Sequence, residues 1–260
     1  MKNFALSLVL CLGVLARAHA AVYFQQASLP PAFPVTAGMD RDSLGNLYVL
    51  GQPAGSATYW VAAFRAPEMT PLFSFDTGLS SPAAFAVEGS GIVDVADLGV
   101  STTAITLRRF QNTGSFVGQS QLTYIRSIYD SKTLQSVAID KAHGLVHATY
   151  QNYVRYYCLM CLGCGCPPSG IKGFIETFDF PGNLVRTVQM PGISATAGSC
   201  YTPSTVAADP QGNVFVADNA CQHVLKYSPT GTLLNDWPAS NWSNYYQFTS
   251  RGMWSDPDSN

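Results

Sequence analysis

Four cysteines stand close together in the middle of the chain, where either a metal site or disulfide bonds could form. Cys158, Cys161, Cys164 and Cys166 have the spacing C-x2-C-x2-C-x-C and are followed by two prolines. Bacterial iron–sulfur sequences have three residues before the last cysteine, and zinc sites pair two C-x2-C arms across a longer loop. Because the spacing fits neither metal site, we expect two disulfide bonds within the segment. Bound metal, bonds to a partner and free thiols remain the alternatives.

The first twenty residues have the features of a secretory signal. Lys2 gives a positive start, Phe4 to Leu15 form a mostly apolar run, and Ala18-His19-Ala20 predicts cleavage after Ala20. The apolar run is shorter than the roughly 20 residues that a membrane span needs, and no later segment is long and apolar enough. We therefore expect a protein without a membrane span after cleavage. It would be secreted and extracellular, or periplasmic in a bacterium.

The remaining cysteines support the disulfide hypothesis. Cys11 would leave with the signal, so the mature chain would keep the four clustered cysteines together with Cys200 and Cys221. Six cysteines allow 15 connectivities. Cys200 precedes one predicted strand and Cys221 follows the next, and an antiparallel hairpin brings those two ends together. We expect Cys200 to pair with Cys221, which leaves three possible arrangements within the cluster.

Other candidate sites are few. His143, His147 and His223 have no metal-binding spacing and are interpreted as structural histidines. No nucleophile elbow, phosphate-binding loop or zinc-protease motif occurs. Asn241 begins a glycosylation sequon, which has meaning only in a eukaryotic host. With 14 Lys and Arg against 16 Asp and Glu, the chain lacks the positive charge typical of proteins that bind nucleic acid, so we expect no nucleic-acid partner.

A repeated pattern organises the rest of the chain. Residues 204–234 predict four short strands separated by turns, with Gly212 and Gly231 where tight turns need a positive φ. Related patterns occur at 37–64, 84–116 and 136–185. The repeat is anchored by acidic residues at intervals of 46, 52, 69 and 47, namely Asp42, Glu88, Asp140, Asp209 and Asp256. A period near 46 with four strands per unit is typical of β-propeller blades.

The string Ala208-Asp-Pro-Gln-Gly-Asn-Val-Phe-Val-Ala-Asp218 and the later His223-Val-Leu-Lys-Tyr-Ser-Pro-Thr-Gly231 resemble the NHL repeat. The resemblance is strong for 204–234, good for 37–49 and weaker elsewhere. It implies an all-β fold, a propeller of four-stranded antiparallel blades that belongs to a six-bladed ring. The 240 residues after cleavage suffice for only four to five blades, so we expect an incomplete ring and a truncated C-terminus.

The recurring acidic residues are interpreted as turn holders and not as catalytic groups. Asp42, Asp140, Asp209 and Asp256 stand at the first turn of a unit, and Asp97 and Asp218 end a second strand. Short carboxylates at such places bond nearby backbone N–H groups. Because these residues recur in every unit, a structural role is favoured for them.

The long third interval indicates an insertion of about 20 residues at 152–172, which contains the cysteine cluster. Tyr153, Tyr156 and Tyr157 lie there, and tyrosine is enriched at interfaces. We therefore expect a binding scaffold for an extracellular protein, peptide or glycan, without a cofactor. The alternative is a six-bladed enzyme that resembles calcium-dependent lactonases or peptide-amidating lyases, for which Ca²⁺ or Zn²⁺ would be needed. No ordered set of metal ligands could be assigned to that alternative.

Overall fold

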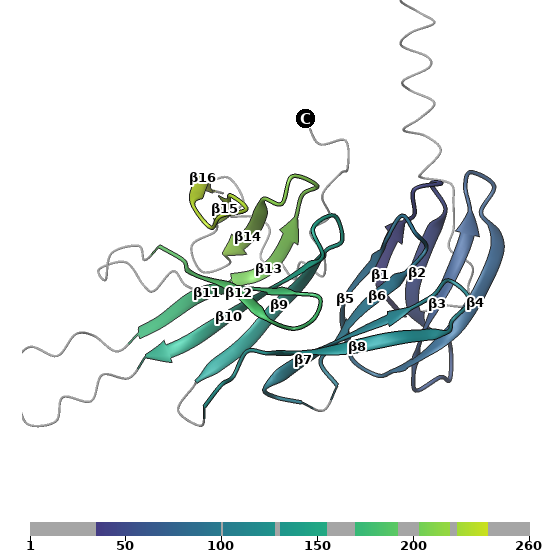
Figure 1. Cartoon of the computed structure of the whole chain (residues 1–260), viewed down its shortest axis with the longest axis horizontal. Helices are drawn as coiled ribbons and strands as arrows, with labels where there is room; N and C mark the ends of the chain where they lie inside the picture. The colour runs from purple at the N-terminus through teal and green to yellow at the C-terminus, as the bar shows by residue number, and fades with distance from the viewer. Residues whose placement is uncertain are drawn as a thin grey trace, which may run out of the picture.

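The computed structural model describes residues 35–99, 101–127, 131–154, 170–191, 203–218 and 223–238. These residues form sixteen strands in four separate antiparallel sheets of four strands each (Figure 1). Within every sheet the strands follow one another in chain order. We call the sheets blades one to four. In the described part of the chain there is no helix long and apolar enough to cross a membrane.

The strands of the four blades are as follows. Blade one contains β1 (Val35–Arg41), β2 (Leu47–Gln52), β3 (Tyr59–Arg65) and β4 (Thr70–Leu79). Blade two contains β5 (Pro82–Val87), β6 (Val93–Asp97), β7 (Ala104–Phe110) and β8 (Phe116–Thr123). Blade three contains β9 (Lys132–Asp140), β10 (Leu145–Val154), β11 (Gly170–Asp179) and β12 (Leu184–Gln189). Blade four contains β13 (Pro203–Ala208), β14 (Val214–Asp218), β15 (His223–Tyr227) and β16 (Leu233–Pro238).

In three of the four blades, the predicted acidic residue holds the turn between the first and second strands. The Asp209 carboxylate accepts hydrogen bonds from the backbone N–H groups of Gln211 and Asn213 and from the Asn213 side chain, at 2.8–3.0 Å. Asp42 accepts the corresponding bonds from Leu44 and Asn46. These bonds satisfy donors that the turn would otherwise leave without partners. Turn holding is thereby confirmed for Asp42 and Asp209.

Asp140 holds its turn through the backbone N–H of His143, at 3.2 Å. Asp97 and Asp218 do end β6 and β14 as predicted. However, Asp97 is buried and its Oδ1 has no hydrogen-bond partner, so this oxygen does not hold the turn. Asp256 lies outside the described residues.

Blades pack through alternating apolar residues of their inner strands. Where blade two meets blade one, Val93, Val95 and Phe110 enter one core cluster with Tyr48 and Leu50. The other two junctions repeat the arrangement. In each blade an aromatic residue near the end of the third strand lies opposite an apolar residue near the start of the second strand. The pairs are Phe64 with Leu47, Phe110 with Val93, Phe178 with Val146, and Tyr227 with Val214.

The first strands bring the blades around a common centre. β1 lies beside β5, β5 beside β9, and β9 beside β13. At the end of these strands, Lys141 Nζ of blade three lies 2.6 Å from Asp40 Oδ2 of blade one. Antiparallel four-stranded blades joined through their first strands define a β-propeller, as predicted.

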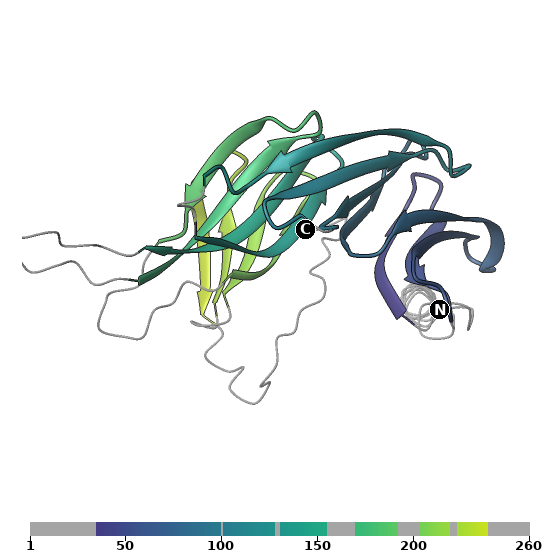
Figure 2. The same ribbon diagram turned by 90° about the horizontal axis from the view of Figure 1, so that it is seen from below.

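Four blades are described, within the predicted range. Blades one and four lie at opposite ends of the set, with blades two and three between them (Figures 1 and 2). Within the described elements, β1 and β13 share no contact comparable to those between successive first strands. That the ring belongs to a six-bladed propeller stays a prediction.

Candidate functional site

Most residues singled out in the sequence lie outside the described part of the chain. These are the signal sequence, Cys158, Cys161, Cys164, Cys166, Cys200, Cys221, Tyr156, Tyr157 and Asn241. Tyr153 is the exception, because its backbone belongs to β10, where it is paired with Ile171 of β11. Residues 152–154 and 170–172, which were predicted to belong to the insertion, are strand residues, and the rest of the insertion connects β10 to β11.

The hairpin formed by β10 and β11 is longer than its own sheet. β9 pairs with β10 only as far as Asn152, and β12 pairs with β11 only from Phe174. The pairing of β10 with β11 continues beyond both limits to Val154 and Gly170. The hairpin therefore leaves the four-stranded sheet as a two-stranded ribbon, and both views show β10 and β11 reaching past their neighbours (Figures 1 and 2).

A buried carboxylate fixes the root of this ribbon. Glu176 of β11 is only 1% exposed. Its two oxygens accept a bidentate pair of hydrogen bonds from Arg126, at 2.8 and 3.1 Å. Lys132 Nζ lies 3.2 Å from Oε1, and the Tyr150 hydroxyl donates to the same oxygen at 2.9 Å. A buried carboxylate is tolerated only when it is paired and hydrogen-bonded in this way.

Aromatic contacts extend the same root toward the ribbon. The Tyr150 and Phe174 rings are stacked with centroids 5.3 Å apart, and Lys132 Nζ lies 4.6 Å from the centroid of Tyr150. Two residue pairs further out, the Ser131 hydroxyl donates to the Asn152 side chain at 2.7 Å. Arg126 and Ser131 belong to the connection from blade two, so this connection, β9, β10 and β11 are tied together where the ribbon begins.

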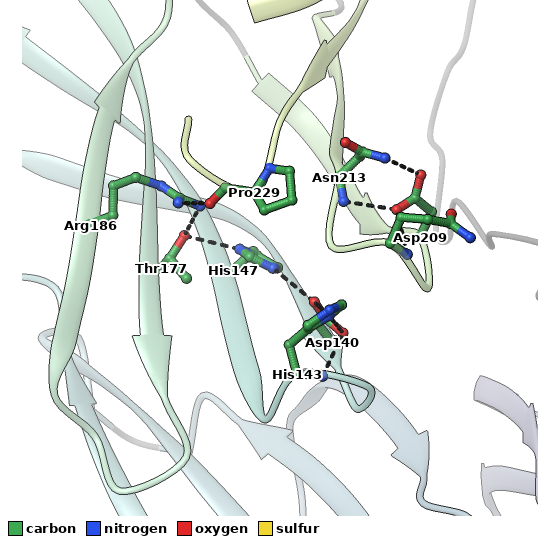
Figure 3. Close-up of polar contacts among 9 residues, drawn as sticks. Asp140, His143, His147, Thr177, Arg186, Asp209, Asn213 and Pro229 are labelled. Carbon is green, nitrogen blue, oxygen red and sulfur yellow. Dashed lines mark hydrogen bonds and ion pairs between the residues drawn. The ribbon is translucent and has the colours of Figure 1, made fainter. Parts of the chain in front are cut away.

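A second polar cluster lies at the opposite end of blade three, where β9 turns into β10 (Figure 3). Asp140 is buried, and its Oδ2 lies 2.8 Å from His143 Nδ1 and 3.9 Å from His147 Nε2. Burial alone would raise the pKa of Asp140, but the imidazoles of His147 and His143 lower it below its ordinary value. Asp140 is therefore ionised at neutral pH.

The cluster continues across the blade as a row of cross-strand neighbours. His147 is paired in register with Thr177, and Thr177 with Arg186. His147 Nδ1 lies 3.0 Å from Thr177 Oγ1, to which Arg186 Nη2 donates at 3.3 Å. Arg186 also donates to the carbonyl of Pro229 in blade four, as Figure 3 shows. The row thus runs from β9 through β12 and reaches the next blade.

The other end of the row also touches blade four. The His143 ring lies against Gly212, where a Cβ would stand 3.1 Å from His143 Cε1. In contrast, His147 is fully buried, and its Nε2 has no hydrogen-bond partner. We call Asp140, His143, His147, Thr177 and Arg186 the polar row.

His143, His147 and His223 each contact a neighbouring polar side chain. His223 Nδ1 lies 2.5 Å from Asp236 Oδ1 at the edge of blade four. No three His, Cys, Asp or Glu side chains in the described ranges are grouped closely enough to hold a metal ion. Sequence reasoning nevertheless missed that two histidines share one carboxylate. The sequence did contain a signal for these clusters. One position of the second strand is aromatic in blades one and four, where it is Tyr48 and Phe215, but ionisable in blades two and three, where it is Asp94 and His147.

Asp94 forms the corresponding cluster in blade two. It is completely buried, and Arg109 Nε donates to its Oδ1 at 2.8 Å. Arg109 also pairs with Glu88, and its guanidinium lies 4.8 Å from the ring centroid of Phe180 in blade three. Burial raises the pKa of Asp94 to about 7, against the lowering effect of Arg109.

Comparison with known proteins adds little beyond the fold. No model of a known protein family matches the sequence, and no curated protein is significantly similar to it. Similar solved structures include hydrazine synthase from Kuenenia stuttgartiensis, with 12% identity over 78% of this chain and a TM-score of 0.49. A streptogramin B lyase has 11% identity over 82% and a TM-score of 0.47. A gluconolactonase from Xanthomonas campestris has 14% identity over 79% and a TM-score of 0.41.

This chain spans 62%, 57% and 62% of the lengths of those three structures, respectively. Similarities this low say nothing about activity. The assignment to the β-propellers rests on the chain's own strand order and blade packing.

Proposed function

We propose that this protein is a secreted, NHL-like propeller that acts as a binding scaffold, with the β10–β11 ribbon as its recognition element. The observation that carries the proposal is the register of blade three. Its middle strands keep pairing past Asn152 and Phe174, where both outer strands have stopped. Loops held on a rigid framework are the usual place of function in such folds.

The root of the ribbon supports this role because several polar and aromatic contacts hold it. Glu176 is held by Arg126 and Lys132, and the stacked rings of Tyr150 and Phe174 fill the space beside it. A binding element that is already ordered loses less conformational entropy when it meets its ligand. The cluster therefore suits a ribbon that presents a fixed surface.

The residues carried by the ribbon also support binding. Residues 155–169 connect its two strands and contain the four clustered cysteines and two tyrosines, and Tyr153 lies on the ribbon itself. Two disulfide bonds would brace this segment outside the cell, and tyrosines are common anchors at interfaces. We propose an extracellular protein, peptide or glycan as the ligand.

The test uses a ribbon variant in which residues 155–169 are replaced by residues 53–58, the connection between the equivalent strands of blade one. Peptide-display libraries and a glycan array are screened with the intact protein. We expect the selected ligands to bind the ribbon variant at least about 100-fold more weakly, a loss of about 2.7 kcal/mol. The control is Phe116→Ser, an exposed residue of blade two, which should bind as the intact protein does.

Circular dichroism and thermal unfolding would establish that the ribbon variant keeps its blades. Ligands that bind the ribbon variant and the intact protein equally would overturn the proposal. So would hydrolysis of lactones that depends on one tightly bound Ca²⁺ or Zn²⁺ per chain.

A further inference from the structure

The polar row forms a joint between blades three and four that has two separate contacts. At one end Arg186 of β12 donates to the Pro229 carbonyl, in the turn before β16. At the other end the His143 ring lies against Gly212, in the turn before β14. Both contacts are positioned by groups of the row, because Thr177 bonds Arg186 and Asp140 bonds His143.

His147 lies between the two ends of the row and contacts groups of both. Its side chain is 1% exposed, with Nδ1 bonded to Thr177 and Nε2 directed at Asp140 from 3.9 Å, beyond hydrogen-bond distance. A neutral His147 can accept the Thr177 hydroxyl proton at Nδ1. Arg186 can only donate, so Thr177 Oγ1 is already an acceptor in that bond.

We propose that the joint between blades three and four responds to protons, and that proton uptake by His147 loosens both of its contacts with blade four. This inference is independent of the proposed binding role. A protonated imidazole carries N–H groups on both nitrogens. Thr177 must then accept from His147 as well as from Arg186, and its own hydroxyl proton loses its acceptor.

The added charge on His147 would also change the partner of the Asp140 carboxylate. Two cations, His147 and Arg186, would then lie on either side of the buried Thr177, and Asp140 is the anion within reach of His147. The ion pair of Asp140 with His147 strengthens as the 3.9 Å separation closes, because buried charges need a close partner. As Asp140 turns toward His147 it releases His143, and with it the contact at Gly212.

The other charged groups around the row do not replace Asp140. On the blade four side, Asp209 is held by Asn213 and lies 3.7 Å from Lys226 Nζ. Lys141, next to Asp140 in the turn, is paired with Asp40 of blade one. Burial lowers the pKa of Arg186 because it disfavours the charged guanidinium. A second cation nearby would disfavour this charge further.

The test is hydrogen exchange of the full-length protein between pH 7.5 and 5, expressed as protection factors so that the intrinsic effect of pH is removed. We expect residues 203–218 and 223–238 to lose protection as the pH falls, by up to about tenfold per pH unit for one coupled proton. The peptide covering β2 and β3 of blade one, which contains no histidine, is the internal control and should keep its protection.

His147→Phe places at this position the residue that blade four has at Phe215, and should abolish the response. His147→Gln provides the same test if the phenylalanine variant does not fold. His143→Gln removes the contact at Gly212 but keeps His147, so the response of residues 223–238, which contain the Arg186 contact at Pro229, should remain. A wild-type protein with no response, a response that persists without His147, or a response lost with His143 alone would each overturn the proposal.

Discussion

Gly231 of blade four lies so close to Val188 of blade three that a Cβ built on it would stand 2.6 Å from Val188 Cγ2. Gly114 of blade two has the same relationship to Phe75 of blade one, at 2.7 Å. Both glycines occupy the turn between the third and fourth strands of their blade and have a positive φ. The same turn therefore fits closely against the preceding blade at two different junctions.

This contact predicts that Gly231→Ala lowers the free energy of unfolding by about 2–4 kcal/mol. About 1 kcal/mol comes from the positive φ and about 1–3 kcal/mol from overpacking against Val188. Gly55→Ala is the matched control, because Gly55 has a similar φ of 78° but no atom within 4 Å of its Cβ position. Urea unfolding measures both, and equal losses would show that the contact between blades contributes nothing.

Because an aspartate carboxylate holds the first turn of blade four, we expect its removal to destabilise the folded protein. Asp209→Ala leaves two backbone N–H groups and the Asn213 amide without their acceptor. We expect a loss of about 1–3 kcal/mol in the free energy of unfolding. Asp209→Asn should recover part of it, since an amide oxygen still accepts hydrogen bonds. A neutral effect of Asp209→Ala in thermal unfolding would contradict the turn-holding role.

The buried pair of Asp94 and Arg109 predicts a pH dependence. Because the pKa of Asp94 is raised to about 7 in the folded state, the folded protein binds this proton more tightly than the unfolded chain does. The stabilisation is complete below about pH 4 and is lost as the pH rises to about 7, by up to about 1.4 kcal/mol per pH unit. Asp94→Asn should flatten this slope in urea unfolding.

Asp179→Asn serves as its control. The hydrogen bonds from Asn183 lower the pKa of the exposed Asp179, so any contribution from this residue is lost as the pH falls. An unchanged slope between pH 4 and 7 in Asp94→Asn would show that Asp94 does not titrate there.

The root of the ribbon predicts that Glu176→Gln is strongly destabilising. The substitution leaves Arg126 and the nearly buried Lys132 facing a neutral amide. Breaking a buried ion pair on one side costs about 3–5 kcal/mol. The exposed Glu68→Gln should change stability by less than about 0.5 kcal/mol. A similar small effect for Glu176→Gln would show that the cluster does not fix the ribbon.

If the protein is secreted, as we propose, all six cysteines that follow the predicted cleavage site should be oxidised. Alkylation of the secreted protein without reductant should leave Cys158, Cys161, Cys164 and Cys166 unmodified, and peptide mapping should join Cys200 to Cys221. Complete alkylation of the four clustered cysteines would exclude disulfide bonds among them. Metal analysis of the same sample distinguishes metal-bound thiolates from free thiols.

Much of the fold could be predicted because its signals are local. Asp209 and Gly212 define one turn, Gly231 defines another, and β-branched and aromatic residues between them predict the strands. The repeat of these signals predicted β-propeller blades, and each of the four described blades has strands at the predicted positions, although the fourth strand of blade one, β4, had not been placed. The ribbon was predicted only as an insertion, because its pairing depends on where β9 and β12 stop.

Hairpin pairing and turn geometry depend on residues close together in the chain, so the blade, its turns and the position of the insertion could be predicted from local patterns. The three-dimensional packing was needed to show that Glu176 meets Arg126, that Asp140 lies between two histidines, and that Arg186 reaches Pro229. Strand register and the packing of one blade on the next bring these groups together from positions up to 50 residues apart. No local pattern contains that information, because a one-residue change of register would turn Glu176, His147 or Arg186 to the opposite face of its sheet.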